Sequence, residues 1–591
     1  MVHQPHLKKI PDANGFTLIE ALIAVALFII IVTPLYMAYA KIIEIIQKNQ
    51  TKAYAIALIQ NQIETIRNIP YDEVGVVGSF PPGPIPPTQT IQYRGSSFSI
   101  QTTIRNIDDP SDGVTPQDTA PADYKLIEVS AFCTTCANAV PLKITTTTAP
   151  KALEASGNTG SLFVNVFDAS GNAISGVNVQ VINNALAPPI SITDTTGLNG
   201  MFQLVGIPTS TASYAISISK PGYSSDATYP LGAPGNPNPI KPHATVAESQ
   251  LTQVSFAIDK VSTLDIQTKD DFCAVVPAVP FSITGTKLLG SDPNVLKYTS
   301  NAQTDSNGFS KINNLEWDTY SFLVGGGGYD LAGNTPLMPL IVNPSSTYDM
   351  RWMILPSATP SILITVQNAS GTLIDNATVN IQNANVDRTV QTGRRSVTKQ
   401  DWRASNYTSQ SGSIDAESSS TMQLLQENGA YSTTTEEWLI SHTIDFGTTN
   451  TTFYTLSWIP ENQPWQTGPN SLRFQIAANN DNALWNFIGP DGTANTFFST
   501  SGNSVNGLFG SNRYMRYKVY MKTEDSAQTP SLESITISFS SSCIPSGQTL
   551  ISALPTGAYT LTVTAPGYQA YTDSALTISN GWQSYQVTIA P

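Results

Sequence analysis

Glu20 is the only charged residue in one of the most apolar stretches of the sequence, GFTLIEALIAVALFIIIV at residues 15–32. A carboxylate near the centre of a bilayer costs about 2.5–3.5 kcal/mol on insertion scales. A charge kept in such a place needs a counter-charge, because an unpaired buried ion is poorly tolerated. The chemistry that Glu20 offers is therefore ion pairing in an apolar environment.

The flanks of this stretch indicate a membrane helix behind a short basic leader. Twenty consecutive uncharged residues separate Glu20 from Lys41, enough to cross a bilayer at about 1.5 Å per residue. The leader, MVHQPHLKKIPDANG, carries two lysines and should stay on the cytoplasmic side. A secretory signal peptide has its cleavage site after the apolar core. Here the signal-like junction, Gly15-Phe16, precedes that core, so cleavage would remove the leader and keep the helix.

The segment GFTLIE resembles the processing site of the type IV pilin and pseudopilin family. In that family a prepilin peptidase cuts after a glycine, the new N-terminal aromatic residue is methylated, and a glutamate occupies the fifth mature position. The resemblance implies a leader at residues 1–15, cleavage after Gly15 and methylation of Phe16. It also implies that Glu20 acts in assembly, pairing with the N-terminal ammonium of a neighbouring subunit and favouring one axial register. The alternative is a plain membrane anchor whose Glu20 lies among the lipid headgroups.

A long helix must carry these residues. Beyond the membrane stretch, isoleucines recur at three- and four-residue spacing, which is typical of an amphipathic helix. They are Ile56, Ile59, Ile63 and Ile66. Pro70 lacks a backbone donor and should end the helix. We therefore predict a helix over residues 16–69, with its transmembrane half at about 18–40 and a kink at Pro34.

A small β domain is predicted after the helix, over residues 70–152. The proline-rich connector SFPPGPIPP is followed by alternating apolar and polar residues, as in IQYRGSSFSIQTTIRNI and DYKLIEVSAF. The pilin resemblance, which covers residues 1–150, implies that this antiparallel sheet packs on the second half of the helix.

Downstream, the sequence repeats itself. SLFVNVFDASGNAISGVNVQVINN begins at Ser161, and SILITVQNASGTLIDNATVNIQNA begins at Ser361, an offset of 200. Two later segments, SYAISISKPGY and AYTLTVTAPGY, end at Tyr223 and Tyr568, an offset of 345. The jump of 145 between these offsets indicates a domain inserted into the later copy.

A weaker copy lies between these two, and the copies resemble the carboxypeptidase regulatory-like and Cna-B-like family of Greek-key β-sandwiches. The resemblance implies sandwiches at residues 160–260, at 261–356, and at 360–392 joined to 543–591. The predicted fold class is thus a long N-terminal α-helix, transmembrane and pilin-like, followed by mostly all-β tandem sandwiches with an inserted jelly-roll-like β-sandwich. Such domains occur as stalks beside many functions, so their fold says little about chemistry.

The inserted segment, residues 393–542, holds five of the eight tryptophans and resembles a jelly-roll sandwich of the galactose-binding or lectin-like kind. Exposed aromatic rings beside Arg and Asp would stack on a sugar and hydrogen-bond it. The candidate glycan-binding residues are Trp458, Trp465, Trp485 and Arg516. The alternative is that these rings fill the core of the sandwich.

One strand of the insertion alternates clearly, in RYMRYKVYM at residues 513–521. The alternation places two sets of side chains on opposite faces: Met515, Tyr517, Val519 and Met521 on one, Arg516, Lys518 and Tyr520 on the other. Asp481 and Asp491 would suit a calcium site, but acidic turns are usually only turns, and we predict no metal site.

Four cysteines fall in the exported part of the chain. In that compartment Cys133 and Cys136, in CTTC, favour a disulfide over a metal site, because a second ligand pair is missing. Cys273 and Cys543 lie in different modules, and the sequence leaves their pairing open.

Catalytic signatures are absent from the sequence. No GxSxG elbow, HExxH or Walker loop occurs, and cleavage of the leader would leave only His243 and His442 for a Ser-His-Asp arrangement. We therefore predict no enzyme activity and no cofactor. The formal net charge of −14 at pH 7, with dispersed Lys and Arg, also argues against nucleic-acid binding.

Two functions follow as alternatives. The first is a minor pilin-like or pseudopilin-like surface protein, whose helix enters a type IV pilus or type II secretion-like filament and whose sandwiches project as a stalk or adhesin. Its partners would be other pilin subunits, a prepilin peptidase, the membrane and, for an adhesin, surface glycans. It would cross the bacterial cytoplasmic membrane once and then reach the cell surface or an extracellular filament. The second is a membrane-tethered carbohydrate-binding or carbohydrate-active envelope protein with a pilin-like export signal.

Overall fold

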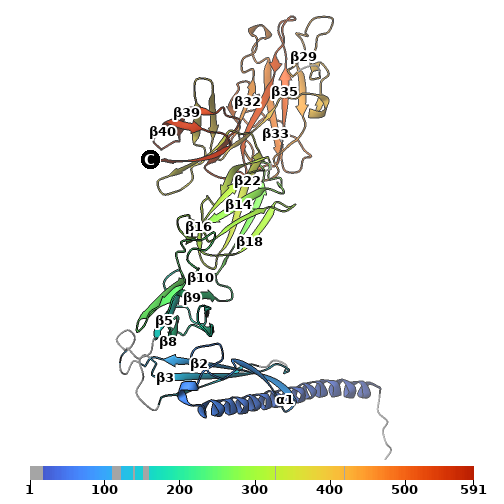
Figure 1. The fold of residues 1–591 in the computed structure, drawn as a ribbon. Coiled ribbons are helices and arrows are strands. Elements are labelled where there is room, and N and C mark those ends of the chain that lie inside the picture. The colour runs from blue at the N-terminus through green and yellow to red at the C-terminus, as the bar shows by residue number, and fades with distance from the viewer. Residues whose placement is uncertain are drawn as a thin grey trace, which may run out of the picture. The chain divides into compact units, whose positions relative to one another are not determined.

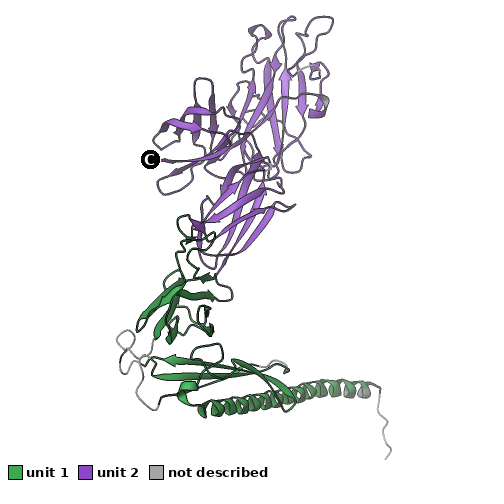
Figure 2. Ribbon diagram, viewed as in Figure 1, with its two compact units in different colours: residues 1–221, 225–258, 290–293 green, residues 222–224, 259–289, 294–591 purple. Residues whose placement is uncertain are grey.

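One long α-helix followed by β-sheets makes up the computed structural model, which confirms the predicted fold class (Figure 1). The structure describes residues 18–109, 113, 122–136, 140–150, 159–326, 328–417 and 420–591. The chain divides into two compact units (Figure 2). The first comprises residues 1–221, 225–258 and 290–293, and the second comprises 222–224, 259–289 and 294–591.

The helix α1 (Leu18–Arg67) has 50 residues, which corresponds to about 75 Å at 1.5 Å per residue. It passes through Pro34 without ending, and the hydroxyl of Thr33 donates a hydrogen bond of 2.8 Å to the carbonyl of Ile29 beside it. Pro70 follows the helix and directly precedes the 3₁₀ turn η1 (Tyr71–Glu73), as its missing donor predicts.

A four-stranded antiparallel sheet covers the second half of α1 (Figure 1). Its strands are β1 (Thr88–Tyr93), β2 (Ser96–Ile107), β3 (Tyr124–Cys133) and β4 (Leu142–Thr148). The helix buries Ala55, Leu58, Ile59, Ile63 and Ile66 in the core that it shares with this sheet. Of the predicted isoleucine stripe, Ile56 alone stays at the exposed edge. Cys133 and Cys136, at the end of β3, are joined in a disulfide.

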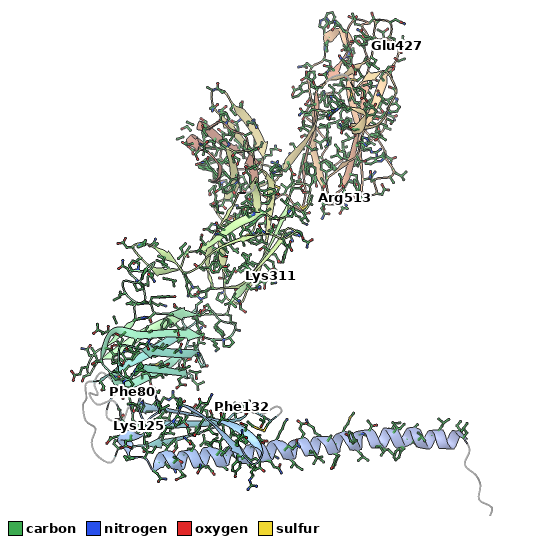
Figure 3. All side chains as sticks on the ribbon, turned by 45° about the vertical axis from the view of Figure 1, so that its right-hand side comes forward. Phe80, Lys125, Phe132, Lys311, Glu427 and Arg513 are labelled. Carbon is green, nitrogen blue, oxygen red and sulfur yellow. A yellow bond between two sulfur atoms is a disulfide. The ribbon has the colours of Figure 1, made fainter. Side chains whose placement is uncertain are left out.

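Lys125, which is labelled in Figure 3, connects the segment after α1 to this sheet by hydrogen bonds. Its side chain is buried, and its Nζ donates hydrogen bonds to the carbonyls of Tyr71 at 2.6 Å and Val74 at 2.8 Å. Burial lowers the pKa of Lys125, because the charged ammonium loses water. The two carbonyl bonds replace that water and hold η1 against β3.

Three β-sandwiches follow, and each consists of two sheets. The first has the orders β12-β5-β8 and β10-β9-β6-β7, with β11 on β9. The second has β18-β13-β22-β20 and β17-β14-β19-β21, and the third has β38-β23-β41 and β25-β24-β39-β40. In each, the first strand pairs in parallel with the last strand of the same repeat: β5 with β12, β13 with β22, and β23 with β41. The three repeats therefore share a common core topology, to which the second adds β20 beside β22.

The strands of the sandwiches have the following bounds. In the first they are β5 (Thr159–Phe167), β6 (Asn178–Asn183), β7 (Ile190–Thr195), β8 (Met201–Pro208), β9 (Ser210–Ser219), β10 (Asp226–Ala227), β11 (Ala244–Val246) and β12 (Leu251–Ala257). In the second they are β13 (Ser262–Lys269), β14 (Pro280–Gly285), β17 (Thr299–Gln303), β18 (Phe309–Leu315), β19 (Asp318–Val324), β20 (Tyr329–Thr335), β21 (Leu340–Val342) and β22 (Thr347–Pro356). In the third they are β23 (Ser361–Asn368), β24 (Thr378–Gln382), β25 (Asp387–Gln391), β38 (Gln548–Ile551), β39 (Gly557–Thr564), β40 (Tyr571–Ile578) and β41 (Trp582–Ile589).

Each repeat also keeps one buried tyrosine in the same structural position. Its hydroxyl donates a hydrogen bond to a backbone carbonyl a few residues upstream. The three are Tyr214, Tyr320 and Tyr559, with distances of 2.6, 2.9 and 2.8 Å. The middle copy, the weakest in sequence, is thus structurally equivalent to the other two.

The insertion opens one tight turn of the third repeat. In the first repeat this turn connects β7 to β8 and is closed by a hydrogen bond of 2.9 Å from the N–H of Gly197 to the carbonyl of Met201. In the third repeat the equivalent bond, 3.0 Å long, runs from the N–H of Gly393 to the carbonyl of Gln548. The closing bond of the turn therefore survives although the whole insertion lies between its two residues.

A glycine with positive φ ends this turn in all three repeats, and its carbonyl accepts a hydrogen bond from the first strand. These glycines are Gly200, Gly308 and Gly547, with φ of 72°, 67° and 64°. Glycine is required there, because other residues rarely adopt this left-handed conformation.

The inserted segment forms two main sheets and a small third one. Their orders are β26-β37-β32-β34, then β27-β30-β35-β31 with β33 on β35, and β28-β29-β36. The strands are β26 (Arg395–Lys399), β27 (Tyr407–Gln410), β28 (Ile414–Asp415), β29 (Met422–Leu424), β30 (Glu437–Ser441), β31 (Ile444–Asp445), β32 (Thr452–Ile459), β33 (Leu472–Asn479), β34 (Asn503–Ser504), β35 (Tyr514–Met521), β36 (Ser531–Leu532) and β37 (Ser534–Ser540). The first strand of the insertion, β26, pairs antiparallel with the last, β37, so its two ends lie side by side.

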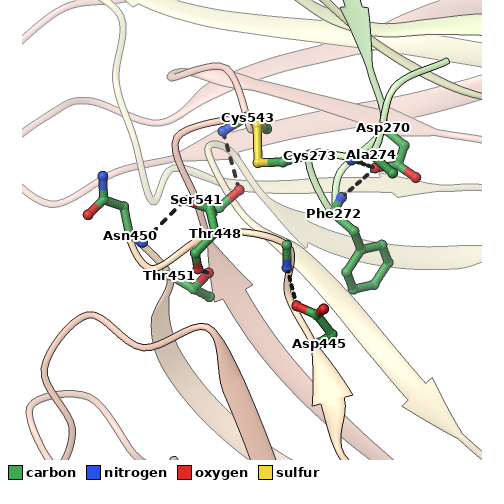
Figure 4. The surroundings of a disulfide bond; sticks show 11 residues. Asp270, Phe272, Cys273, Ala274, Asp445, Thr448, Asn450, Thr451, Ser541 and Cys543 are labelled. Atoms are coloured by element: carbon green, nitrogen blue, oxygen red, sulfur yellow. Dashed lines mark hydrogen bonds between the residues drawn. A yellow bond between two sulfur atoms is a disulfide. The ribbon is translucent and has the colours of Figure 1, made fainter. Parts of the chain in front are cut away.

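Within the second unit, a disulfide joins the second sandwich to the segment that follows β37, the last strand of the insertion (Figure 4). It links Cys273 to Cys543, whose Cα atoms are 5.5 Å apart, so the pair that the sequence left open is formed. Beside it, the ring of Phe272 lies 5.6 Å from the ring of Phe539, centroid to centroid. Arg395 adds an ion pair of 3.1 Å with Asp271. Covalent, apolar and ionic contacts thus meet at this junction.

We expect the double variant Cys273→Ser/Cys543→Ser to lower the free energy of unfolding by about 2–5 kcal/mol, the usual cost of losing a native disulfide. The bond spans 270 residues of chain, so its loss frees much conformational entropy in the unfolded state. Calorimetry of the full chain measures the effect. The matched control is Cys133→Ser/Cys136→Ser, whose bond spans only three residues and whose loss should cost less. Equal destabilisation by both double variants would contradict the loop-length argument.

Candidate functional site

The N-terminal half of α1 leaves its apolar side chains uncovered by the rest of the described chain (Figure 1). The exposed large apolar residues there include Leu18, Ile19, Leu22, Ile23, Val25, Leu27, Phe28, Ile29, Ile30, Ile31, Leu35, Met37, Ile42 and Ile46. A contiguous apolar surface of this kind marks an interaction site for protein or membrane. Among the described residues this helix is long and apolar enough, over Val25–Arg67, to cross a membrane, with a mean hydropathy of 2.0.

Glu20 lies in the first turn of α1 as the structure describes it. The charged residue nearest to Glu20 along α1 is Lys41, 21 positions further on. By contrast Glu44, further along, pairs with Lys41 at 2.7 Å and Lys48 at 2.8 Å. In the sequence, Glu20 therefore has no basic residue three or four positions away, the spacing at which side chains of one helix pair. The predicted cleavage site, Gly15 and Phe16, lies outside the described residues.

The structure separates the four predicted glycan-binding residues. Trp458 is only 2% exposed and its ring lies 4.6 Å from that of Phe474, so the prediction for Trp458 is wrong. The reason is its inward position on β32, where the ring fills the core between the sheets. Trp465 is 86% exposed in the 3₁₀ turn η3 (Trp465–Thr467).

Trp485 and Arg516, the other two predicted residues, lie in contact. The guanidinium carbon of Arg516 is 4.4 Å from the centroid of the Trp485 ring, and its Nε donates a hydrogen bond of 2.9 Å to Thr443. Burial lowers the pKa of Arg516. The predicted set therefore reduces to one cation–π pair and one isolated exposed tryptophan.

The candidate residues from the sequence did not include Lys518, Tyr520 or Trp438. Lys518 Nζ lies 4.5 Å from the centroid of Trp438 and 4.7 Å from that of Tyr520. The alternation of β35 had placed Arg516, Lys518 and Tyr520 on one face, and the burial of that strand confirms it. Trp438 comes from β30, and no local signal in the sequence links it to β35.

The two acidic residues considered for calcium cap turns. Asp491 accepts hydrogen bonds from the N–H of Thr493 at 2.8 Å and the hydroxyl of Thr496 at 2.5 Å, which together hold its pKa below the usual range. Asp481 accepts one from the N–H of Ala483 at 2.9 Å. In the described parts of the chain, no three His, Cys, Asp or Glu side chains gather as metal ligands would.

Residues 11–36 match the prokaryotic N-terminal methylation motif, a type IV pilin signal. The match includes Gly15, Phe16 and Glu20 and runs into the uncovered half of α1. With the apolar helix behind it, this signal supports membrane anchoring and a surface-exposed C-terminal part, as in a pilin-like surface protein. No curated protein is significantly similar to the chain.

Several solved structures align with parts of the chain at low identity. The TIE protein of Bacillus anthracis is 11% identical over 85% of this chain and 72% of its own, with a TM-score of 0.16. The shaft pilin SpaA of Lactobacillus rhamnosus GG is 14% identical over 34% of this chain and 98% of its own, with a TM-score of 0.14. A minor pilin of Streptococcus agalactiae is 15% identical over the same two shares, with a TM-score of 0.17.

Proposed function

We propose that this chain is a minor pilin-like or pseudopilin-like subunit, whose α1 enters a type IV pilus or type II secretion-like filament. Its β-sandwiches would project from that filament as a stalk or adhesin. A prepilin peptidase and other pilin subunits would be its partners, and the cytoplasmic membrane its site before assembly.

One observation carries this proposal: a methylation motif leads directly into a helix whose apolar half is left uncovered by the described part of the chain. A simple anchor needs only about 20 apolar residues. Here the helix has 50 residues, and its second half packs on the β1–β4 sheet. This packing holds the helix in one orientation relative to the sheet, so the uncovered half projects from the sheet in a fixed direction. In the sequence, the first basic residue after Glu20 is Lys41, 21 positions away, so assembly with another subunit would supply the counter-charge.

Leader processing gives the direct test. We expect mass spectrometry of the mature protein to find Phe16 at the N-terminus with a methylated amine. A Gly15→Leu variant should keep its leader and remain in the membrane, because the peptidase would no longer recognise the junction. An intact leader in the unaltered protein, or cleavage after the apolar run, would contradict the proposal.

A second candidate is a membrane-tethered carbohydrate-binding protein that uses a pilin-like export signal. The contact between Trp485 and Arg516 favours it, since a cation beside an aromatic ring suits a sugar ligand. Recovery of the processed chain in sheared filaments would separate the two, because a protein that is only tethered would stay with the cells.

A further inference from the structure

Cations and aromatic rings gather on the outer face of one sheet of the inserted domain. β35 buries every second residue, so Arg516, Lys518 and Tyr520 point away from the core. Trp438 on β30 pairs directly with Tyr520, and directly paired residues project from the same face of a sheet. We call Trp438, Trp485, Arg516, Lys518 and Tyr520 the cation–aromatic face. The strand β35 begins at Tyr514, directly after Arg513, which is labelled in Figure 3.

Contacts between its members hold the face in place. Lys518 lies over Trp438 and Tyr520, and Arg516 over Trp485, at the distances given above. The hydroxyl of Tyr520 donates a hydrogen bond of 2.8 Å to Gln475, whose Nε2 in turn bonds the carbonyls of Ala494 and Thr496. All five side chains of the face remain partly exposed. The rings are thus positioned and the charged ends stay within reach of a ligand.

The two cations at the centre of this face have no carboxylate partner among the described residues, whereas those at its margins do. Arg473 makes hydrogen bonds of 2.6 and 2.7 Å to the two carboxylate oxygens of Glu436. Arg513 bonds both oxygens of Asp445, at 2.8 and 2.9 Å. The inserted domain as a whole is acidic, with 13 Asp and Glu against 8 Lys and Arg over residues 395–540. Arg516 and Lys518 thus present two unpaired positive charges on one face of β35, which an anionic ligand would neutralise.

We propose that the cation–aromatic face binds a saccharide whose rings carry carboxylates, an oligomer of uronic acids. Aromatic ring faces stack on the apolar C–H faces of sugars, while an arginine can grip a carboxylate with two parallel hydrogen bonds. Arg516 and Lys518 are alternate residues of one strand, about 6.8 Å apart, so successive sugar rings can each present a carboxylate to a cation. The inference names a ligand class for the proposed adhesin. It rests on the proposed function in one respect, that the inserted domain lies outside the cell, where such a ligand would be found.

A single-stranded nucleic acid is the competing ligand, since it too combines stacking rings with anionic groups. Charge argues against it. Nucleic-acid affinity comes mainly from many neutralised phosphates, and this face offers two free cations on a chain of net charge −14. A short ligand with few charges and well-fitted rings suits the face better.

The test measures binding of fluorescently labelled oligogalacturonate and alginate oligomers to the full chain in detergent. Lys518→Gln is expected to weaken binding at least about tenfold, because a hydrogen bond to a charged group is lost. Arg516→Gln should do the same, and the double variant should bind still more weakly. Lys399→Gln on β26 removes the same charge from the other sheet and serves as the matched control, with unchanged binding expected. Thermal unfolding of each variant checks that it remains folded.

Three outcomes would overturn the proposal. The first is no binding of either acidic oligomer. The second is equal binding of methyl-esterified oligogalacturonate, which keeps the rings but lacks the charges. The third is equal or tighter binding of an oligothymidylate, which would assign the face to nucleic acid. Because binding is measured on the purified chain, its failure is distinguishable from a failure of leader processing or filament recovery.

Discussion

Replacing Glu20 with alanine is expected to leave membrane insertion intact and to lower recovery of the chain in sheared filaments about a hundred-fold or more. Insertion should be easier, because the cost of a charge in the bilayer disappears. Assembly should suffer, because removing one partner of a buried ion pair costs about 3–5 kcal/mol. At about 1.4 kcal/mol per tenfold, this corresponds to at least a hundred-fold loss in association. Immunoblots of sheared and cell-bound fractions at equal expression measure the ratio.

Glu64→Ala is the matched control for this variant. Glu64 lies on the same helix, is exposed, and forms an ion pair of 3.2 Å with Arg67, one turn further along the helix surface. Such surface pairs contribute little, about 0–1 kcal/mol, so its loss should leave filament recovery unchanged. Normal incorporation of Glu20→Ala would disprove the pairing with a neighbouring subunit. Loss of the variant from the membrane fraction would instead show that Glu20 acts during insertion.

Excising the inserted domain is expected to abolish any saccharide binding while leaving the third sandwich folded. The design replaces residues 393–546 with Gly-Leu-Asn, the residues at 197–199 that form the same turn in the first repeat. The hydrogen bond from Gly393 to Gln548 shows that the two cut ends already occupy the positions of a closed turn. Loop-closure entropy changes by only about 0.6 kcal/mol per doubling of length, so the host should accept the short turn. Cys273→Ser is included, because Cys543 is removed.

Calorimetry measures whether the remaining domains of the excised variant stay folded, and a binding assay measures whether saccharide binding is lost. The variant should lose the unfolding transition of the inserted domain and keep the others, and the excised piece should fold alone, since about 150 residues suffice for a core. A three-residue Gly-Ser-Gly linker in place of Gly-Leu-Asn is the control for the sequence of the turn. Unfolding of the third sandwich in both variants would show that β23–β25 and β38–β41 depend on the insertion and form one larger sandwich with it.

Local patterns in the sequence were enough to predict the helix and the processing signal that precedes it. The unbroken apolar run after Glu20, the isoleucine stripe and Pro70 predicted a helix that the structure places at Leu18–Arg67. Alternation alone assigned the two faces of β35. The offset between repeats indicated an insertion beginning near residue 393, where the turn of the third repeat opens. These features depend on residues a few positions apart or on repeated copies of one segment. They can therefore be recognised in a single amino-acid sequence.

Contacts between distant segments were decided only by the tertiary structure. Trp458 and Trp438 both lie on strands of the insertion, yet one fills the core and the other joins the cation–aromatic face. Which side of a strand is buried depends on the second sheet that packs on it, and the sequence of the strand does not contain that sheet. The same holds for Cys273 and Cys543, which are 270 residues apart and meet where the second sandwich contacts the end of the insertion. By itself, then, the sequence determined the periodic elements, the repeats and the assembly signal. The order and packing of the strands decided which side chains meet at the disulfide and on the outer face of β35, because such pairings join residues that no local pattern connects.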